Sequence, residues 1–98
     1  MIKMKILAIE REVKGAKWDT VGDLLKNEAR HVFELYLSDI LREIYFTENK
    51  NAVLVLESKD KSTAKKILDS FPLVESGKIK FELMELRPYN GYERLINE

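Results

Sequence analysis

His31 and Glu28 are the side chains whose types and positions best suit the movement of a proton. His31 is the only histidine in the sequence, and imidazole titrates closer to neutral pH than any other ordinary side chain. It falls at the rim of an apolar helical stripe, so it either reaches a pocket or is a partly exposed helix histidine. Glu28 falls inside the stripe, where a carboxylate must be paired or protonated. It is either a general acid or base in a cavity, or a structural partner of a lysine or a helix end.

Arg42, Glu43 and Tyr45 lie together in a strand-like run. Because side chains alternate along a strand, Arg42 is predicted on one face of the sheet, and Glu43 with Tyr45 on the other. Arg42 would hold a substrate carboxylate in bidentate fashion, while Glu43 and Tyr45 would transfer a proton. A cross-strand or interfacial ion pair is the competing interpretation of Glu43. Glu57 and Glu10, each at a strand end, carry the same two interpretations.

Three aromatic residues fall in loops: Trp18, Tyr89 and Tyr92. Such residues close a pocket or anchor an interface in many proteins, and plain packing is the alternative. The sequence has no Gly-rich phosphate loop, no clustered metal ligands, no Gly-x-Ser-x-Gly motif and no cysteine. Nucleotide, metal-dependent, serine-hydrolase and thiol mechanisms therefore have no basis in the sequence, and we expect no cofactor and no metal.

The elements that must position these residues follow from the hydrophobic periodicity. Alternating or continuous apolar runs predict strands, and apolar residues three and four apart predict helices. The predicted strands are 3–11, 40–47, 51–57 and 78–86, and the predicted helices are 21–37 and 59–71. Asp19 with Thr20 and either Ser58 or Asp60 are the expected helix N-caps. Pro72 should end the second helix.

The order β-α-β-β-α-β predicts an α+β, ferredoxin-like domain over residues 1–98, with a C-terminal tail at about 88–98. Both helices should cover one face of a four-stranded antiparallel sheet. Strand 51–57 places Leu54 and Leu56 on one face and Val53 and Val55 on the other. The uncovered face is then apolar, and a second copy of the chain is its simplest cover.

Several segments together resemble the muconolactone isomerase-like branch of the dimeric α/β-barrel superfamily, and the likeness spans nearly the whole chain. They are 42–46, 52–57, 71–74 and 87–88, with sequences REIYF, AVLVLE, FPLV and RP. The resemblance implies a homodimer or higher oligomer, a pocket for a small molecule between sheet and helices, and proton transfer on a lactone or related carbonyl compound without a cofactor.

The charge balance of the sequence limits the kinds of partner that the protein is expected to bind. Seventeen basic and seventeen acidic residues cancel, which argues against nucleic acid and an anionic membrane as partners. The N-terminal ten residues alternate lysine with apolar side chains, unlike a signal peptide, so we expect a cytoplasmic protein.

Two hypotheses for the function follow from the sequence. One is an isomerase in which Arg42 orients an anionic substrate and Glu28, His31 or Glu43 moves a proton; the other is a non-catalytic dimeric module that binds a metabolite or serves assembly.

Overall fold

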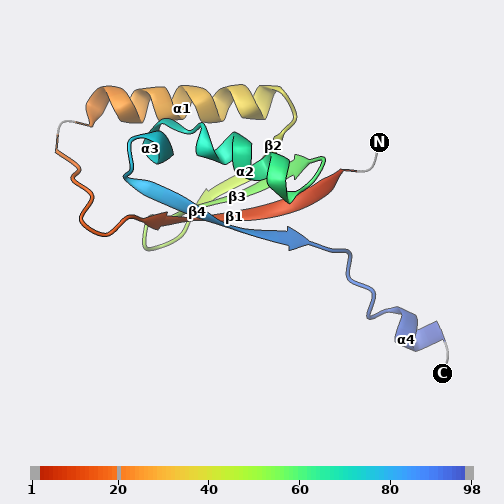
Figure 1. The fold of residues 1–98 in the computed structure, drawn as a ribbon. Helices are drawn as coiled ribbons and strands as arrows, with labels where there is room; N and C mark the ends of the chain where they lie inside the picture. The colour runs from red at the N-terminus through yellow and green to blue at the C-terminus, as the bar shows by residue number, and fades with distance from the viewer. Residues whose placement is uncertain (1–2, 20, 97–98) are drawn as a thin grey trace.

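The computed structural model describes residues 3–19 and 21–96. It is an α+β arrangement in which three helices lie on one side of a four-stranded sheet and a short fourth helix lies in an extended tail (Figure 1). The elements are, in order, β1 (Met4–Glu12), α1 (Gly22–Leu37), β2 (Leu41–Phe46), β3 (Ala52–Ser58), α2 (Lys61–Asp69), α3 (Pro72–Glu75), β4 (Ile79–Leu86) and α4 (Glu93–Ile96). The strands and the two long helices confirm the sequence prediction, with ends shifted by one or two residues.

The sheet is antiparallel throughout, with strand order β2-β3-β1-β4. This arrangement is compatible with a ferredoxin-like fold. In the central pair, Ile6 lies opposite Leu56 and Ala8 opposite Leu54. These four side chains point toward the helices and are almost completely buried. The strand periodicity of two therefore assigns one face of β1 and β3 to the core.

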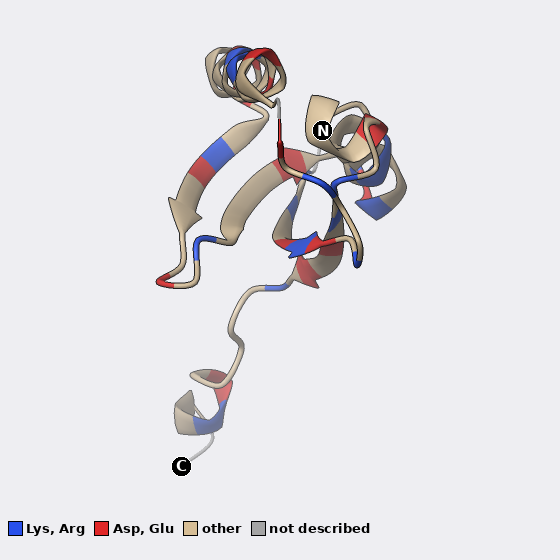
Figure 2. Ribbon diagram, turned by 90° about the vertical axis from the view of Figure 1, so that its left-hand side faces the viewer, with Lys and Arg blue, Asp and Glu red and all other residues tan. Residues whose placement is uncertain are grey.

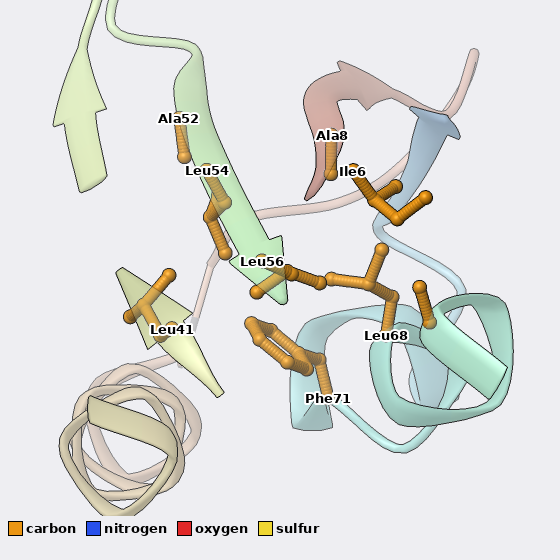
Figure 3. Close-up of a cluster of buried hydrophobic side chains, with 9 residues drawn as sticks. Ile6, Ala8, Leu41, Ala52, Leu54, Leu56, Leu68 and Phe71 are labelled. Carbon is orange, nitrogen blue, oxygen red and sulfur yellow. The ribbon is translucent and has the colours of Figure 1, made fainter. Parts of the chain in front are cut away.

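The core lies between that face and α2. Leu68 and Ala64 of α2, together with Phe71, pack against the strand residues in the cluster drawn in Figure 3. Leu68 and Phe71 are each only 1% exposed. Burial of such side chains contributes roughly 1.5–3 kcal/mol each before entropy is counted. This cluster is the part of the structure that fixes the sheet and α2 relative to each other.

The ends of α2 and α3 follow local rules that the sequence contains. Asp60 caps α2, since its carboxylate accepts a 2.7 Å hydrogen bond from the Thr63 amide. Ser58, the other expected cap, instead donates its hydroxyl to the Asp60 carbonyl at 2.6 Å. Pro72 ends α2 as predicted and also takes the first position of α3, where its missing N–H costs nothing.

Helix α1 departs from expectation in its start and in its packing. Its N-cap is Val21, with no side-chain cap, in place of Asp19 or Thr20; Thr20 lies outside the described residues. The apolar stripe was expected to be buried, but no described residue of α1 is fully buried. The helix packs on α3 and β2, and its described hydrophobic residues that pack against the core are Val32 and Leu35. In Figure 2, α1 lies over the edge of the sheet formed by β2, and α2 lies over the other strands.

The face of the sheet opposite the helices is apolar along its middle. Leu7 lies opposite Val55 there, and Ile9 opposite Val53. These four side chains are half-buried, and no described element covers them. Exposed residues of the same face continue the apolar surface toward both sheet edges: Tyr45, Met84 and Leu86. We call this surface the helix-free face.

The C-terminal tail leaves β4 and extends away from the rest of the molecule (Figures 1 and 2). It gives the chain a radius of gyration of 16.0 Å, against about 13 Å for a spherical domain of this length. Its apolar side chains are strongly exposed, from 63% for Tyr89 to 79% for Ile96. The tail nevertheless has local structure, since the rings of Tyr89 and Tyr92 meet edge to face at 4.8 Å.

Candidate functional site

A groove of about 900 Å³ lies between α1 and the helix side of the sheet. It exists because α1 rests on α3 and β2 and leaves the sheet below it open. The α1 stripe forms one wall, through Leu25, Glu28, Ala29, Val32, Phe33 and Tyr36. The opposite wall comes from the sheet, mainly from Ile44, Phe46, Leu54 and Phe81. This volume falls within the usual range for small-molecule pockets.

The walls are apolar and remain open to solvent. Leu25 is 46% exposed, Phe33 58% and Phe46 76%. Large apolar side chains seldom gather in this way on a protein surface unless they serve contact with something else. The groove is therefore the concave surface of the described chain best suited to an apolar body.

Two carboxyl groups from different elements face the groove. Glu28 of α1 accepts a 3.0 Å hydrogen bond from the Leu73 amide at the start of α3. Burial raises the pKa of Glu28; the Leu73 hydrogen bond lowers it, and the nearby charge of Glu10 raises it further. The pKa of Glu10, on β1, is also raised by burial, partly offset by a hydrogen bond from the Ala52 amide. Both groups therefore hold a proton to higher pH than an ordinary glutamate.

Glu12 and Trp18 form the end of the groove beside the β1–α1 connection. The indole Nε1 of Trp18 donates a 2.6 Å hydrogen bond to Glu12 Oε1. Glu12 shares a strand face with Glu10, because the two are separated by one residue in β1. The Lys78 ammonium lies over the Trp18 ring, 6.0 Å from its centre. The only tryptophan of the chain is therefore fixed at the site.

The hairpin between β2 and β3 supplies the remaining polar groups. Asn51 donates its side-chain amide to the Glu10 carbonyl at 3.0 Å, which ties the hairpin to β1. Lys50 adopts a left-handed conformation, with φ of 65°, and lines the groove. It is the only basic residue among those that line it, against three acids.

The predicted site residues do not all converge on this groove. Trp18 and Glu28 line it, while His31, Glu43, Tyr45, Arg42, Glu57 and Tyr89 do not. Glu28 also reaches the end of a helix, as one of its two interpretations required. His31 packs edge to face on Phe71 at 4.8 Å, with Nε2 3.3 Å from the Ser70 hydroxyl. The side chain of His31 therefore links α1 to the end of α2.

Arg42 forms ion pairs in place of facing the groove. A bulge between Leu41 and Glu43 makes Arg42 an extra residue in β2. Its guanidinium lies 3.5 Å from Glu57 and 3.4 Å from Asp39. Glu57 belongs to the helix-free face, so Arg42 reaches the same side as Glu43 and not the opposite side expected from simple alternation.

Glu43 and Tyr45 form a separate pair on the helix-free face. The Tyr45 hydroxyl donates a 3.0 Å hydrogen bond to Glu43 Oε1. That bond, reinforced by the carboxylate charge, raises the pKa of the phenol. Both side chains are exposed. Tyr89, in the tail, contacts Tyr92 and not the groove.

Sequence reasoning missed Glu12 and Lys50 and did not select Glu10 above Glu57. The period of two along β1 was a usable signal, since it places Glu10 and Glu12 on the face of Ile6 and Ala8. No comparable pattern in the sequence pointed to Lys50, because the geometry of the β2–β3 hairpin brings it to the groove.

Among the described residues, no group of three or more potential ligands could hold a metal ion. No helix in the described part of the chain is both long and apolar enough to cross a membrane.

In comparisons with known proteins, no family model and no curated protein matches the chain. A function for this chain is therefore argued from the geometry of the groove.

Proposed function

We propose that this protein binds a small molecule in the groove between α1 and the sheet. The observation that carries the proposal is the open apolar stripe of α1, which faces the sheet across a groove of about 900 Å³. A helix that had only a structural role would lower its free energy by packing this stripe on the strands. Carboxyl groups at one end of the apolar space would orient a ligand, as the few polar groups of such pockets commonly do.

Filling the groove tests this proposal. Ala29 lines the groove from α1, so Ala29→Trp would occupy ligand space without removing a core contact. Lys26→Trp is the matched control, because Lys26 is an exposed residue of the same helix that does not line the groove. We expect native mass spectrometry or a fragment screen followed on the Trp18 indole resonance to detect ligands for wild type and Lys26→Trp. Equal binding by Ala29→Trp would contradict the proposal.

A second candidate is catalysis of proton transfer on a lactone or related carbonyl compound. The raised pKa values of Glu10 and Glu28, both caused mainly by burial, favour it, because a general acid or base works best when it titrates near the working pH. In such a site one carboxylate would take a proton from the carbon beside the carbonyl, and the other carboxyl would return one elsewhere. The expected catalytic pair is then Glu10 and Glu28, with His31, Glu43 and Tyr45 outside the site.

Exchange of carbon-bound hydrogen for deuterium would distinguish catalysis from simple binding. Wild type should accelerate exchange next to the carbonyl of a five-membered lactone, and Glu28→Gln and Glu10→Gln should each lose most of that acceleration. Glu43→Gln, on the helix-free face, should keep it. A groove that binds such a compound without any exchange would leave the non-catalytic binding module as the function.

We also propose that the helix-free face packs on a second copy of this chain, so that the two copies form a dimeric α/β barrel. Its apolar middle, Leu7, Ile9, Val53 and Val55, is flanked by side chains of both signs, including the Arg11–Glu82 and Arg42–Glu57 pairs. A surface of this kind can match its own copy across a two-fold axis. The tail extends away from the helix-covered side with its aromatic residues exposed, and would add contact area with that copy.

Sedimentation of a charge variant tests the assembly. Val55→Lys places a cation in the middle of the helix-free face, and Lys26→Glu changes a charge on the far side of the molecule. We expect the first variant to sediment as a monomer and the second to match a dimeric wild type. A wild type that is monomeric at about 100 μM would contradict this part of the proposal, since stable homodimers remain associated well below that concentration.

A further inference from the structure

The charges that line the groove indicate what kind of small molecule it takes. Three acids face the space: Glu10 and Glu12 from β1 and Glu28 from α1. Lys50, from the β2–β3 hairpin, is the only base among the lining residues, and Tyr36 is the other titratable side chain there. The groove is therefore acidic in a chain whose total charge is zero.

The acids are concentrated where they can act on one group. Glu10 from β1 and Glu28 from α1 line the same groove, and the charge of Glu10 helps to raise the pKa of Glu28. Two carboxylates that share a partly buried space repel each other, and a cation between them would relieve that repulsion. Glu12 is held nearby by the Trp18 indole. Neutral ligands would leave this repulsion in place, and anions would add to it.

The rest of the groove suits the apolar part of such a cation. Aromatic residues contribute to every side: Trp18 at the β1 end, Phe33 and Tyr36 from α1, Phe71 from the α2–α3 junction, and Phe46 and Phe81 from the sheet. Aromatic faces attract cations as well as apolar surface. Arg42, the residue expected to hold an anionic substrate, is instead paired with Glu57 and Asp39.

We propose that the ligand of this groove is a protonated amine carried on an apolar, ring-sized body, with its ammonium group between Glu10 and Glu28. This inference rests on the proposed binding function and specifies the class of ligand. In the complex, the ammonium donates hydrogen bonds to the two carboxylates, while the ring lies along Leu25, Phe33 and Phe46. An ion pair at a partly buried site of this kind gains from charge-assisted hydrogen bonds.

Three probes test the class of ligand: cyclohexylmethylamine, cyclohexylmethanol and cyclohexanecarboxylate. They share a cyclohexyl ring with one attached carbon and differ in a polar group that is cationic, neutral or anionic. None of them absorbs where tryptophan does, so fluorescence of Trp18 reports binding directly, with calorimetry as a second measurement. At pH 7.5 we expect the amine to bind at least about tenfold more tightly than the alcohol, and the carboxylate most weakly. Equal affinity for amine and alcohol, or tighter binding of the carboxylate, would contradict the proposed class of ligand and leave the proposed binding function intact. Failure of all three probes to bind would count against the binding function itself.

Variants assign the effect to the named carboxyl groups. Glu10→Gln/Glu28→Gln should lose the preference for the amine and keep its affinity for the alcohol. The matched control is Glu34→Gln/Glu93→Gln, which removes the same net charge from exposed positions outside the groove. Lys50→Gln, which removes the cation from the groove and leaves its three acids in place, should strengthen amine binding. An unchanged amine preference in the Glu10→Gln/Glu28→Gln variant, shown to be folded by its NMR spectrum, would overturn the assignment.

Discussion

The carboxyl group of Glu28 on α1 accepts a 3.0 Å hydrogen bond from the backbone amide of Leu73 on α3. This bond joins the helix that forms one wall of the groove to the short helix that supports it. In the described part of the chain α1 packs mainly on α3 and β2, and His31 adds a side-chain link to Ser70 and Phe71. The Glu28–Leu73 bond is therefore among the few links that fix the width of the groove. One carboxyl group thus holds the site together and faces its interior.

Glu28→Gln should change how stability depends on pH. Burial raises the pKa of Glu28 in the folded protein above its ordinary value of 4.5. The folded state therefore binds the proton more tightly, so this group stabilises most below pH 4.5 and loses that contribution as pH rises through the raised value. Glutamine stays neutral and can still accept the Leu73 bond. In urea unfolding, the variant should gain stability relative to wild type between pH 4.5 and 7.5; a constant difference would contradict the prediction. Glu34→Gln, at an exposed position of α1, is the control.

Leu68→Ala and Leu25→Ala should differ sharply in stability. Leu68 is 1% exposed in the core, whereas Leu25 is 46% exposed in the groove wall. We expect the core variant to lose roughly 2–5 kcal/mol of unfolding free energy, from lost transfer energy and the cavity left behind. The groove variant should lose well under half of that and should weaken ligand binding. Chemical denaturation and a binding titration check the two effects, and similar losses of stability would mean that α1 is packed on the sheet.

Asp60→Ala should destabilise α2 more than Asp60→Asn does, because asparagine can still accept the Thr63 bond. The hydrogen bond from the Thr63 amide lowers the pKa of Asp60 below its ordinary value of 3.8. The ionised cap therefore stabilises above pH 3.8, and its advantage is lost as pH falls through the lowered value. Thermal unfolding at several pH values should show wild type and Asp60→Asn converging in acid. A gap between them that does not depend on pH would contradict the prediction.

Glu43→Gln should lower the pKa of the Tyr45 phenol. The hydrogen bond to the Glu43 carboxylate raises that pKa, and the negative charge adds to the effect. Removing the charge favours the phenolate, so Tyr45 should ionise at lower pH in the variant. Titration of ring-labelled tyrosine by NMR measures this for the single residue. Glu82→Gln, on the opposite edge strand of the same sheet face, should leave Tyr45 unchanged.

Gly91→Ala should disturb the tail without affecting the core. A Cβ atom at position 91 would collide with the Tyr89 ring, so Tyr89 must move away from its edge-to-face contact with Tyr92. Because α4 contacts no other element of the described chain, the denaturation midpoint of the monomer should stay the same. Changes in the ring-proton shifts of the two tyrosines would report the local effect. A lower midpoint for the isolated monomer would show that the tail packs on the domain.

The sequence by itself determined the four strands, the two long helices and which face of each is apolar, but it did not predict the short helices α3 and α4. Apolar residues at spacings of two and of three to four predicted the four strands and both long helices, and Asp60 and Pro72 marked helix ends, because these are properties of neighbouring residues. Only the tertiary structure decided which side chains share a site. Glu10 and Glu12 meet Glu28 because α1 rests on α3 and β2 and leaves the sheet open, and Arg42 leaves the expected face through a bulge. Such encounters depend on contacts between residues distant in the chain, which local periodicity does not contain.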